Sequence, residues 1–277
     1  MPIDARRMIR KMRGGSQAHL IEAFDGFHYV VKFRNNPQHR RILVNEWVSA
    51  TFLSYLGLST PPVAIVRVTN EFLQKNPDVY IQLGSQRFPP AEGWHFGSRF
   101  PGDPGRMAVY DFLPDALLGK IENLGEFAGA LAFDKWTGNA DARQAIFFRA
   151  RIRDAGRSES SEALGFVAQM IDNGYVFEGP NWGLTDSPVQ GLYFRPLVYR
   201  SVRGWSDFEP WLDRILHFPA DVVDQALKEI PPAWVEDDRD NLERLLERLM
   251  KRRKRVPDLI QACRKARSDP FAAWSAK

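Results

Sequence analysis

The segment from Phe133 to Phe148 constrains the fold of this chain more than any other part of the sequence. It starts at the end of an apolar stretch typical of a helix, passes through a short polar run, and ends in apolar residues typical of a strand. Polar side chains on a loop between two apolar elements often serve binding or catalysis. A helix cap with a tight turn at residues 137–139 explains them equally well, so other segments have to decide. The polar run contains Asp134, Asn139, Asp141, Arg143 and Gln144.

Length and composition describe a folded protein with ample core. The 277 residues are 44% hydrophobic and 26% charged, which suits one large domain or two lobes. The net charge of +4 suits an anionic ligand without calling for nucleic acid. The single cysteine, Cys263, excludes an internal disulfide and a cysteine-rich metal site. No apolar run approaches the roughly 20 residues that span a bilayer, and no apolar signal segment follows the basic N-terminus, so we expect a cytoplasmic protein without a membrane partner.

The first third of the chain predicts a β-hairpin followed by a helix. Residues 19–24 and 29–33 have strand-like patterns on either side of Asp25-Gly26, a favoured tight turn. Residues 42–57 have helical spacing and end at Gly57, a natural helix C-cap. A further strand is expected after Pro62, followed by one or two strands with long loops.

A lysine and a glutamate in this region are candidates for nucleotide binding. Lys32 lies in an otherwise apolar strand, where it either extends to solvent or turns inward to a charged partner. Glu46, near the start of the helix, would be such a partner. A surface lysine and an ordinary helix charge are the alternative. A glycine-rich turn before the hairpin could direct backbone N–H groups at phosphates, although a mobile surface turn is as good an explanation. This turn consists of Gly14, Gly15, Ser16 and Gln17.

The middle of the chain again joins apolar elements by polar loops. We expect a helix over residues 117–136, strands over 146–152 and 164–171, and a polar hairpin tip between the strands. The second strand ends in Asp172-Asn173-Gly174, which is either a favoured β-turn or the position of a metal-binding aspartate. Residues 107–114 are predicted to form a hinge against which adenine would stack.

The C-terminal third predicts helices separated by prolines. Leucines at helical spacing between residues 242 and 250 are more typical of core than of a partner surface. The basic run from Lys251 to Arg255 suits a solvated helix end, with a nucleic-acid or tRNA-related partner as the alternative. The expected helices lie near residues 211–217, 221–230, 240–251 and 258–267.

Together these segments resemble the HipA-like kinase family, small bacterial relatives of the toxin kinase HipA, over about residues 13–260. The resemblance implies an α+β, two-lobed protein-kinase-like fold. Residues 1–108 would form an antiparallel-sheet N-lobe and residues 109–277 a mostly helical C-lobe. It also implies ATP and Mg²⁺ as cofactors and phosphoryl transfer to a Ser or Thr hydroxyl of an unknown protein substrate.

The resemblance assigns roles in the N-lobe to residues already singled out. Gly14, Gly15, Ser16 and Gln17 match the phosphate loop. Lys32 matches the lysine that binds the phosphates, and Glu46 matches the helix glutamate that orients this lysine.

In the C-lobe the resemblance points to the polar loop and the Asp-Asn-Gly segment. Asp141 matches the catalytic aspartate of the family's Asn-x-Asp motif, here Asn139-Ala140-Asp141. Asp172 matches the metal-binding aspartate. Arg143, two residues beyond Asp141, would hold the substrate or a phosphate and completes the predicted catalytic set with Lys32.

One position departs from the family pattern. The asparagine expected five residues after the catalytic aspartate, a second metal ligand, is Ile146 here. Gln144 could supply an amide oxygen to the metal instead. A shifted register would use Asp134 and Asn139, which keep the five-residue spacing and would make Asn139 the ligand. We prefer Asp141 as the base because Asp134 lies where the helix still packs. The departure makes a nucleotide-binding pseudokinase, which regulates a partner, the alternative to an active kinase.

Overall fold

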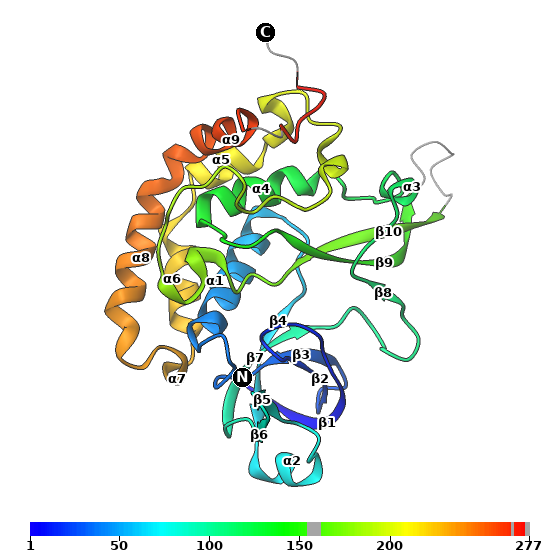
Figure 1. Cartoon of the computed structure of the whole chain (residues 1–277), viewed down its shortest axis with the longest axis vertical. Helices are drawn as coiled ribbons and strands as arrows, with labels where there is room; N and C mark the ends of the chain where they lie inside the picture. The colour runs from blue at the N-terminus through cyan, green and yellow to red at the C-terminus, as the bar shows by residue number, and fades with distance from the viewer. Residues whose placement is uncertain (154–161, 267–268, 275–277) are drawn as a thin grey trace.

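The computed structural model describes residues 1–153, 162–266 and 269–274. Its content is α+β, as predicted, with a small β-barrel at one end and a larger body of helices at the other (Figure 1). A second sheet extends sideways from the helical body. The predicted hairpin tip falls largely on residues 154–161, outside the described part of the chain.

Five strands close into the barrel in the order β1–β2–β3–β7–β4. The prediction of an antiparallel N-terminal sheet was incomplete, because β1 and β4 run parallel and their pairing closes the barrel. Strand β1 was not predicted, since two irregularities in its pairing with β2 interrupt the alternation of its side chains. The barrel strands are β1 (Ile3–Lys11), β2 (His19–Ala23), β3 (His28–Lys32), β4 (Val63–Val68) and β7 (Gly93–Arg99).

The chain between β4 and β7 forms a small extension on the side of the barrel away from the helices (Figure 1). It contains a helix as well as the expected strands. Thr69 caps this helix by accepting a hydrogen bond from the Phe72 N–H, as threonine commonly does at a helix start. The elements are α2 (Asn70–Lys75), β5 (Ile81–Leu83) and β6 (Gln86–Phe88).

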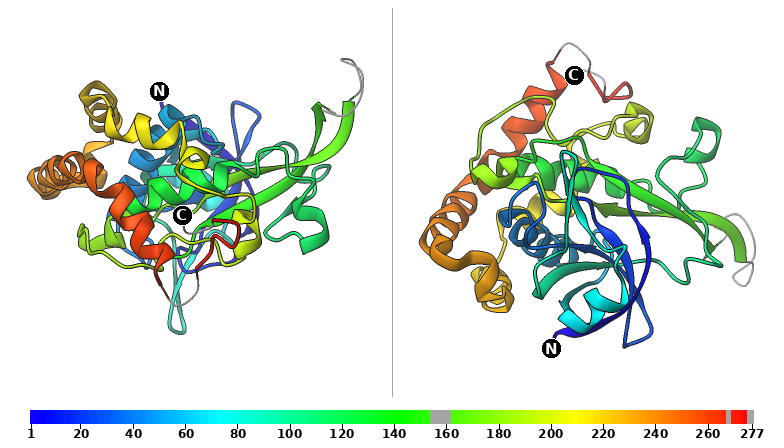
Figure 2. Two further views of the ribbon diagram at one scale, coloured as in Figure 1. Left: turned by 90° about the horizontal axis from the view of Figure 1, so that it is seen from above. Right: turned by 60° about the horizontal axis from the view of Figure 1, so that its bottom comes forward.

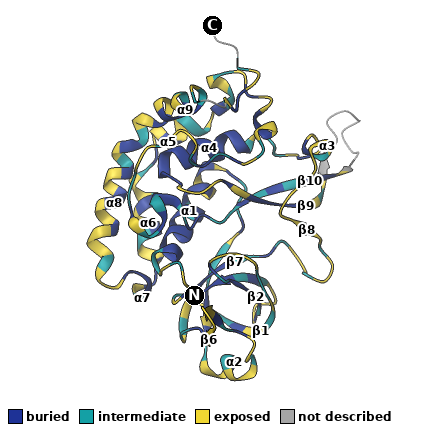
Figure 3. Ribbon diagram, viewed as in Figure 1, coloured by how far each residue is buried: buried dark blue, intermediate teal, exposed yellow. Residues whose placement is uncertain are grey.

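Two buried helices, α1 (Arg41–Leu56) and α4 (Glu126–Thr137), form the centre of the helical body (Figure 3). Gly57 ends α1 in the left-handed conformation, which confirms the predicted C-cap. The single helix predicted over residues 117–136 was wrong at its start, where α3 (Asp115–Leu118) is followed by a loop. Asn123 in this loop exchanges two hydrogen bonds with the backbone of Ala168, so the segment covers a strand edge instead of continuing a helix.

The remaining helices wrap around α1 and α4, with α8 on the outer edge of the molecule (Figure 2). Four leucines of α8 are buried, as the helical spacing predicted. The α-helices are α5 (Trp211–Leu216), α6 (Ala220–Glu229), α7 (Pro232–Val235), α8 (Arg239–Arg252) and α9 (Val256–Arg264). Short 3₁₀ helices are η1 (Val176–Asn181), η2 (Pro196–Tyr199), η3 (Trp205–Phe208), η4 (Glu236–Asp238) and η5 (Arg253–Arg255).

The predicted polar loop and the Asp-Asn-Gly segment lie at the same end of the second sheet. Its strands are β8 (Val109–Tyr110), β9 (Gln144–Arg153) and β10 (Glu162–Ile171), in the order β10–β9–β8. In the antiparallel pair of β9 and β10, Gln144 lies opposite Ile171 and Ile146 lies opposite Gln169. The start of β9 and the end of β10 therefore lie together at the edge that faces the barrel.

Two separate groups of buried apolar residues explain why the barrel and the body are distinct. One fills the interior of the barrel, and the other fills the helical body. Helix α1 contributes Leu43, Val48 and Leu53 to the second group. A division at residue 108 assigns α1 to the N-lobe, but its buried side chains pack with the body.

Gly129 in α4 is required for a close approach between two helices. An added Cβ at this position would lie 2.3 Å from a ring atom of Trp211. We expect Gly129→Ala to lower the free energy of unfolding by about 1–3 kcal/mol through overpacking. Gly125→Ala is the matched control, since its helical backbone has nothing within 4 Å of the added Cβ. Equal urea midpoints for the two variants would contradict this account.

His95 in β7 makes barrel stability dependent on pH. Its ring is fully buried; Nδ1 accepts the Arg34 N–H at 2.9 Å, and Nε2 lies 2.9 Å from the Ala91 carbonyl oxygen. Burial lowers the pKa of His95 from 6.5 to about 4. Below pH 6.5 the unfolded chain therefore binds a proton that the folded chain does not, and stability falls as the pH drops towards 4.

We expect the His95 contribution to unfolding free energy to fall by about 2 kcal/mol between pH 7 and pH 5. His95→Gln keeps an acceptor and a donor but does not titrate, so its urea stability should fall less over the same interval. If both proteins lose equal stability between these pH values, His95 is not the titrating group.

Candidate active site

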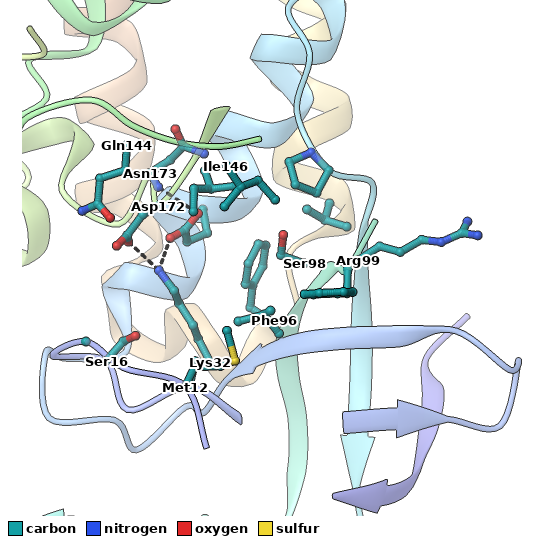
Figure 4. A pocket seen from close by; sticks show the side chains of 18 of the residues that line it. Met12, Ser16, Lys32, Phe96, Ser98, Arg99, Gln144, Ile146, Asp172 and Asn173 are labelled. Atoms are coloured by element: carbon teal, nitrogen blue, oxygen red, sulfur yellow. Dashed lines mark hydrogen bonds and ion pairs between the residues drawn. The ribbon is translucent and has the colours of Figure 1, made fainter. Parts of the chain in front are cut away.

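Three charged side chains from three elements meet at one site. Figure 4 shows two of them, Lys32 and Asp172, pointing toward each other. Lys32 comes from the end of β3, Glu46 from α1, and Asp172 from the residue after β10. The Lys32 ammonium forms an ion pair with Glu46 and lies 2.7 Å from Asp172 Oδ1. The structure thus brings together the predicted phosphate lysine, helix glutamate and metal-binding aspartate.

The electrostatics of this group keep Lys32 charged in a buried position. Burial alone would lower the pKa of Lys32, but the attraction of Asp172 and Glu46 outweighs it and raises the pKa. The neighbouring Lys32 charge lowers the pKa of Asp172, so its carboxylate stays ionised. For Glu46 burial dominates and raises the pKa despite Lys32. The site therefore holds a fixed cation beside an ionised, partly accessible carboxylate.

These side chains line one end of a cavity of about 620 Å³. Farther along, Ile146 lies on one side of the opening, and Phe96 and Ser98 lie on the other (Figure 4). Val109 and Asp111, from the predicted hinge, line the same cavity. A cavity of this volume, polar at one end and apolar in the middle, has the size and character of a small-molecule site.

The predicted phosphate loop divides between the cavity and the barrel. Gly14 and Ser16 line the cavity. Gln17 instead binds β5: its Oε1 accepts the Gln82 N–H at 2.8 Å, and its Nε2 donates to the Gln82 carbonyl at 2.7 Å. Gly15 lies against Gln38, whose Nε2 would be 2.8 Å from an added Cβ. Gln17 and Gly15 therefore shape the loop, while Gly14 and Ser16 face the space that a ligand would occupy.

Strand β9 places Gln144 and Ile146 in different parts of the cavity. Gln144 hydrogen-bonds Asp172, and its Nε2 lies 3.4 Å from Asp141 Oδ2. Ile146, two residues further along the strand, lines the apolar part. The amide of Gln144 thus lies beside the predicted metal-binding carboxylate, whereas Ile146 contributes to the apolar wall.

The loop before β9 holds Asp141 at the surface and Asn139 inside. Asp141 is exposed, and its Oδ1 accepts the Ala142 N–H at 2.8 Å. Asn139 is buried; its Oδ1 accepts the Asp141 N–H at 3.2 Å and its Nδ2 donates to Asp134 at 2.9 Å. Neither Asn139 nor Asp141 is among the residues that line the cavity. Because Asn139 is buried and bonded within the loop, its predicted role as a metal ligand is revised to one in shaping the loop.

Arg143 and Asp134 form an ion pair with both side chains fully buried. Arg143 Nε lies 2.8 Å from Asp134 Oδ2, and Arg143 Nη1 donates to Asn173 Oδ1 at 2.7 Å. The predicted contact between Arg143 and a substrate is revised, because its side chain is fully buried. The same burial disfavours Asp134 as a base and leaves Asp141 as the accessible aspartate of the loop.

Asn173 is a site residue that the sequence did not single out for a role. It lines the cavity, its N–H donates to Glu46 at 3.0 Å, and its side chain accepts from Arg143. Asn173 therefore connects the Arg143–Asp134 ion pair with the Lys32–Glu46 ion pair. Its position directly after Asp172 was the available signal.

The basic run from Lys251 to Arg255, which begins with the last two residues of α8, is not uniformly exposed to solvent. Arg252 is buried, forms an ion pair with Asp186 at 2.5 Å, and donates to the Trp136 carbonyl at 3.0 Å. Arg255 also pairs with Asp186. The prediction of a solvated helix end was therefore wrong for Arg252, which fixes α8 to α4. In the part of the chain that the structure describes, no helix is long and apolar enough to cross a bilayer.

Comparison with known proteins assigns the family. A family model described as HipA-like kinase matches residues 5–146, about half of the chain, and this match includes Lys32, Glu46 and Asp141. Asp172 lies beyond it. No curated protein matches the chain.

Two solved structures of the Golgi casein kinase resemble the chain in three dimensions. The one with Mn/ADP bound has a TM-score of 0.49 and 11% identity, and the alignment covers 96% of this chain and 73% of that chain. The other has a TM-score of 0.47 and 11% identity, with coverage of 98% and 74%. The family assignment rests on the sequence match alone: this chain belongs to the HipA-like kinase family.

Proposed function

We propose that the chain is an ATP- and Mg²⁺-dependent kinase that transfers the γ-phosphate to a Ser or Thr hydroxyl of a protein. The observation that carries the proposal is the meeting of Lys32, Glu46 and Asp172 at one end of a cavity of about 620 Å³. Membership of the HipA-like kinase family supports the same reaction class.

The residues of the site fit both cofactors. Lys32 and the N–H groups of the loop around Gly14 and Ser16 would hold phosphates, and the apolar wall around Ile146 would hold the base. Asp172 and Gln144 offer a carboxylate and an amide oxygen, which are hard donors that Mg²⁺ accepts. When bound, Mg²⁺ would neutralise the negative charge of the phosphates.

The residues of this chain would act on the phosphate tail and on the attacking hydroxyl. The hydroxyl oxygen forms a bond to the γ-phosphorus while the bond from this phosphorus to the bridging oxygen breaks, and ADP leaves with that electron pair. Asp141, exposed beside Gln144, takes the hydroxyl proton. Lys32 stays charged and stabilises the negative charge on the phosphates.

The pseudokinase alternative was motivated by Ile146. The position of Gln144 weakens that motive, because its side chain hydrogen-bonds Asp172 and its amide oxygen is the donor that would replace the missing asparagine. A nucleic-acid partner at residues 251–255 is also less favoured, since Arg252 is buried and Arg255 is paired. We therefore retain the active kinase as the proposal.

The test uses purified protein, Mg²⁺ and an ATP-depleted cell extract as a source of acceptors. Transfer of label from γ-labelled but not α-labelled ATP to Ser or Thr is expected. Asp141→Asn should slow it by about 10²–10⁴-fold, while the ATP-dependent rise in melting temperature stays as in the wild type. If no label is transferred while ATP still raises the melting temperature, the kinase proposal is wrong and the pseudokinase alternative takes its place.

A further inference from the structure

The segment that begins at Asp172 has an unusually strained backbone. Among the described residues, seven residues other than glycine have positive φ, and four of them lie between residues 172 and 182. Such a conformation is strained for a residue with a side chain and persists only where the surroundings hold it in place. The four are Asp172 (57°), Phe177 (56°), Glu178 (57°) and Trp182 (52°).

One buried side chain holds this segment. Asn45 of α1 is fully buried. The two hydrogens of its Nδ2 are shared among three carbonyl oxygens, those of Gly174 at 2.8 Å, Val176 at 3.1 Å and Gly179 at 3.0 Å. Its Oδ1 accepts the Trp182 Nε1–H at 2.8 Å. Because the segment is not a regular helix, its carbonyl groups need donors from outside, and Asn45 supplies them.

The neighbours of Asn45 on α1 bind the same segment. Glu46 accepts the Asn173 N–H, and Arg41 donates to the Pro180 carbonyl at 2.8 Å. Gly174 lies so close to α1 that an added Cβ would be 2.7 Å from Ile42 Cγ2. Since α1 is itself fixed in the core of the helical body, residues 173–182 are fixed to a rigid support.

We propose that Asn45 is a positioning residue: its carboxamide holds residues 173–182 in their strained conformation and thereby fixes the carboxylate of Asp172 for metal-dependent nucleotide binding. This inference rests on the proposed role of Asp172 as a metal ligand. Asn45 does not line the cavity and binds the backbone that follows Asp172, so it acts through the backbone and not by touching the ligand.

The test separates metal-dependent from metal-independent binding. Binding of a fluorescent ATP analogue is titrated with Mg²⁺ and, separately, measured with EDTA. Asn45→Ala is expected to weaken the apparent Mg²⁺ affinity by about 10–100-fold, as loss of a group behind a metal ligand typically does. Affinity for the analogue in EDTA should stay within about twofold, since Asn45 touches no part of the cavity.

Ser49→Ala is the matched control. Ser49 lies one turn further along α1, is fully buried, and its hydroxyl has no hydrogen-bond partner in the described part of the chain. If Asn45→Ala fails to fold, Trp182→Phe keeps an aromatic ring beside the Arg41 guanidinium, while it removes the bond to Asn45 Oδ1 and part of the indole packing. It should weaken the apparent Mg²⁺ affinity by about 2–10-fold, the value of one hydrogen bond.

Hydrogen exchange of the ligand-free protein gives a readout that needs no cofactor. In Asn45→Ala, faster exchange is expected in residues 173–183 and not in the barrel. Unchanged Mg²⁺ affinity and unchanged exchange would overturn the role of Asn45 and leave the proposed function intact. If the wild type shows no Mg²⁺-dependent binding, the proposed function fails. Unchanged hydrogen exchange in Asn45→Ala would in that case also rule out that Asn45 holds residues 173–182 in place.

Discussion

Replacing Asp172 with asparagine is expected to slow phosphate transfer by at least ~10³-fold, because one substitution removes the ionised donor from the predicted metal site. Asparagine keeps the size of the side chain but has no negative charge, so it attracts a divalent cation much less strongly than the carboxylate does. Lys32 retains its ion pair with Glu46, so the variant should fold with only a modest loss of stability. The measurement is the initial rate of label transfer from γ-labelled ATP at saturating Mg²⁺.

The control for this substitution is Asp4→Asn on the surface of the barrel. Asp4 is also paired with a cation, Arg67, but this pair lies on the exposed outer wall, and its removal should leave the rate within about twofold. Transfer by Asp172→Asn within tenfold of the wild type would contradict the proposed role of Asp172. Loss of transfer together with loss of ATP binding would show that Asp172 is needed to hold the nucleotide as well as to process it.

The parts of the site that could be predicted from sequence are those that local patterns specify. Lys32 stands out because a lysine in an apolar strand needs a partner, and Glu46, fourteen residues later in a predicted helix, is such a partner. Asp172 stands out because it follows an apolar strand directly. In the structure these residues meet, because the ends of β3 and β10 and the first half of α1 lie at the same edge of the barrel.

The parts that could not be predicted depend on contacts between distant segments. Arg143 was assigned to a substrate or a phosphate because it lies two residues beyond Asp141, the catalytic aspartate that the family resemblance implies. Its burial follows from the paired strand end at Ile171, whose carbonyl it binds, and from Asp134 in the preceding helix. Arg252 lies in a run of five basic residues, and its buried contact with the Trp136 carbonyl, 116 residues earlier in the chain, distinguishes it from Arg255, which also pairs with Asp186. Charge patterns along the sequence do not contain this information.

The barrel shows the same limit for backbone structure. Strand β1 carries three arginines and a lysine in nine residues, a composition more typical of an exposed tail than of a strand. Its pairing with β2 shifts register twice, so its side chains do not alternate, and its parallel pairing with β4 joins residues more than 60 positions apart. Neither feature is visible in a local window of sequence.

The largest effect on stability is expected from Asp134→Ala. This substitution would leave the Arg143 guanidinium, which is fully buried, without its carboxylate partner. Removing one member of a buried ion pair costs about 3–5 kcal/mol, because the remaining charge is neither hydrated nor paired. Asp134 also accepts the Asn139 side-chain N–H, so its loss releases both anchors of the loop that carries Asp141. Urea unfolding measures the effect directly.

Two comparisons separate the cost of an unpaired charge from the loss of packing. Glu243→Ala breaks the exposed Arg239–Glu243 pair on α8 and should cost about 0.3–0.5 kcal/mol. The double variant Asp134→Leu with Arg143→Met removes both charges and should lose less stability than Asp134→Ala alone, since no buried charge remains. A double variant that is less stable than the single one would mean that Arg143 holds the loop mainly through its bonds to Ile171 and Asn173, and that the ion pair with Asp134 is secondary.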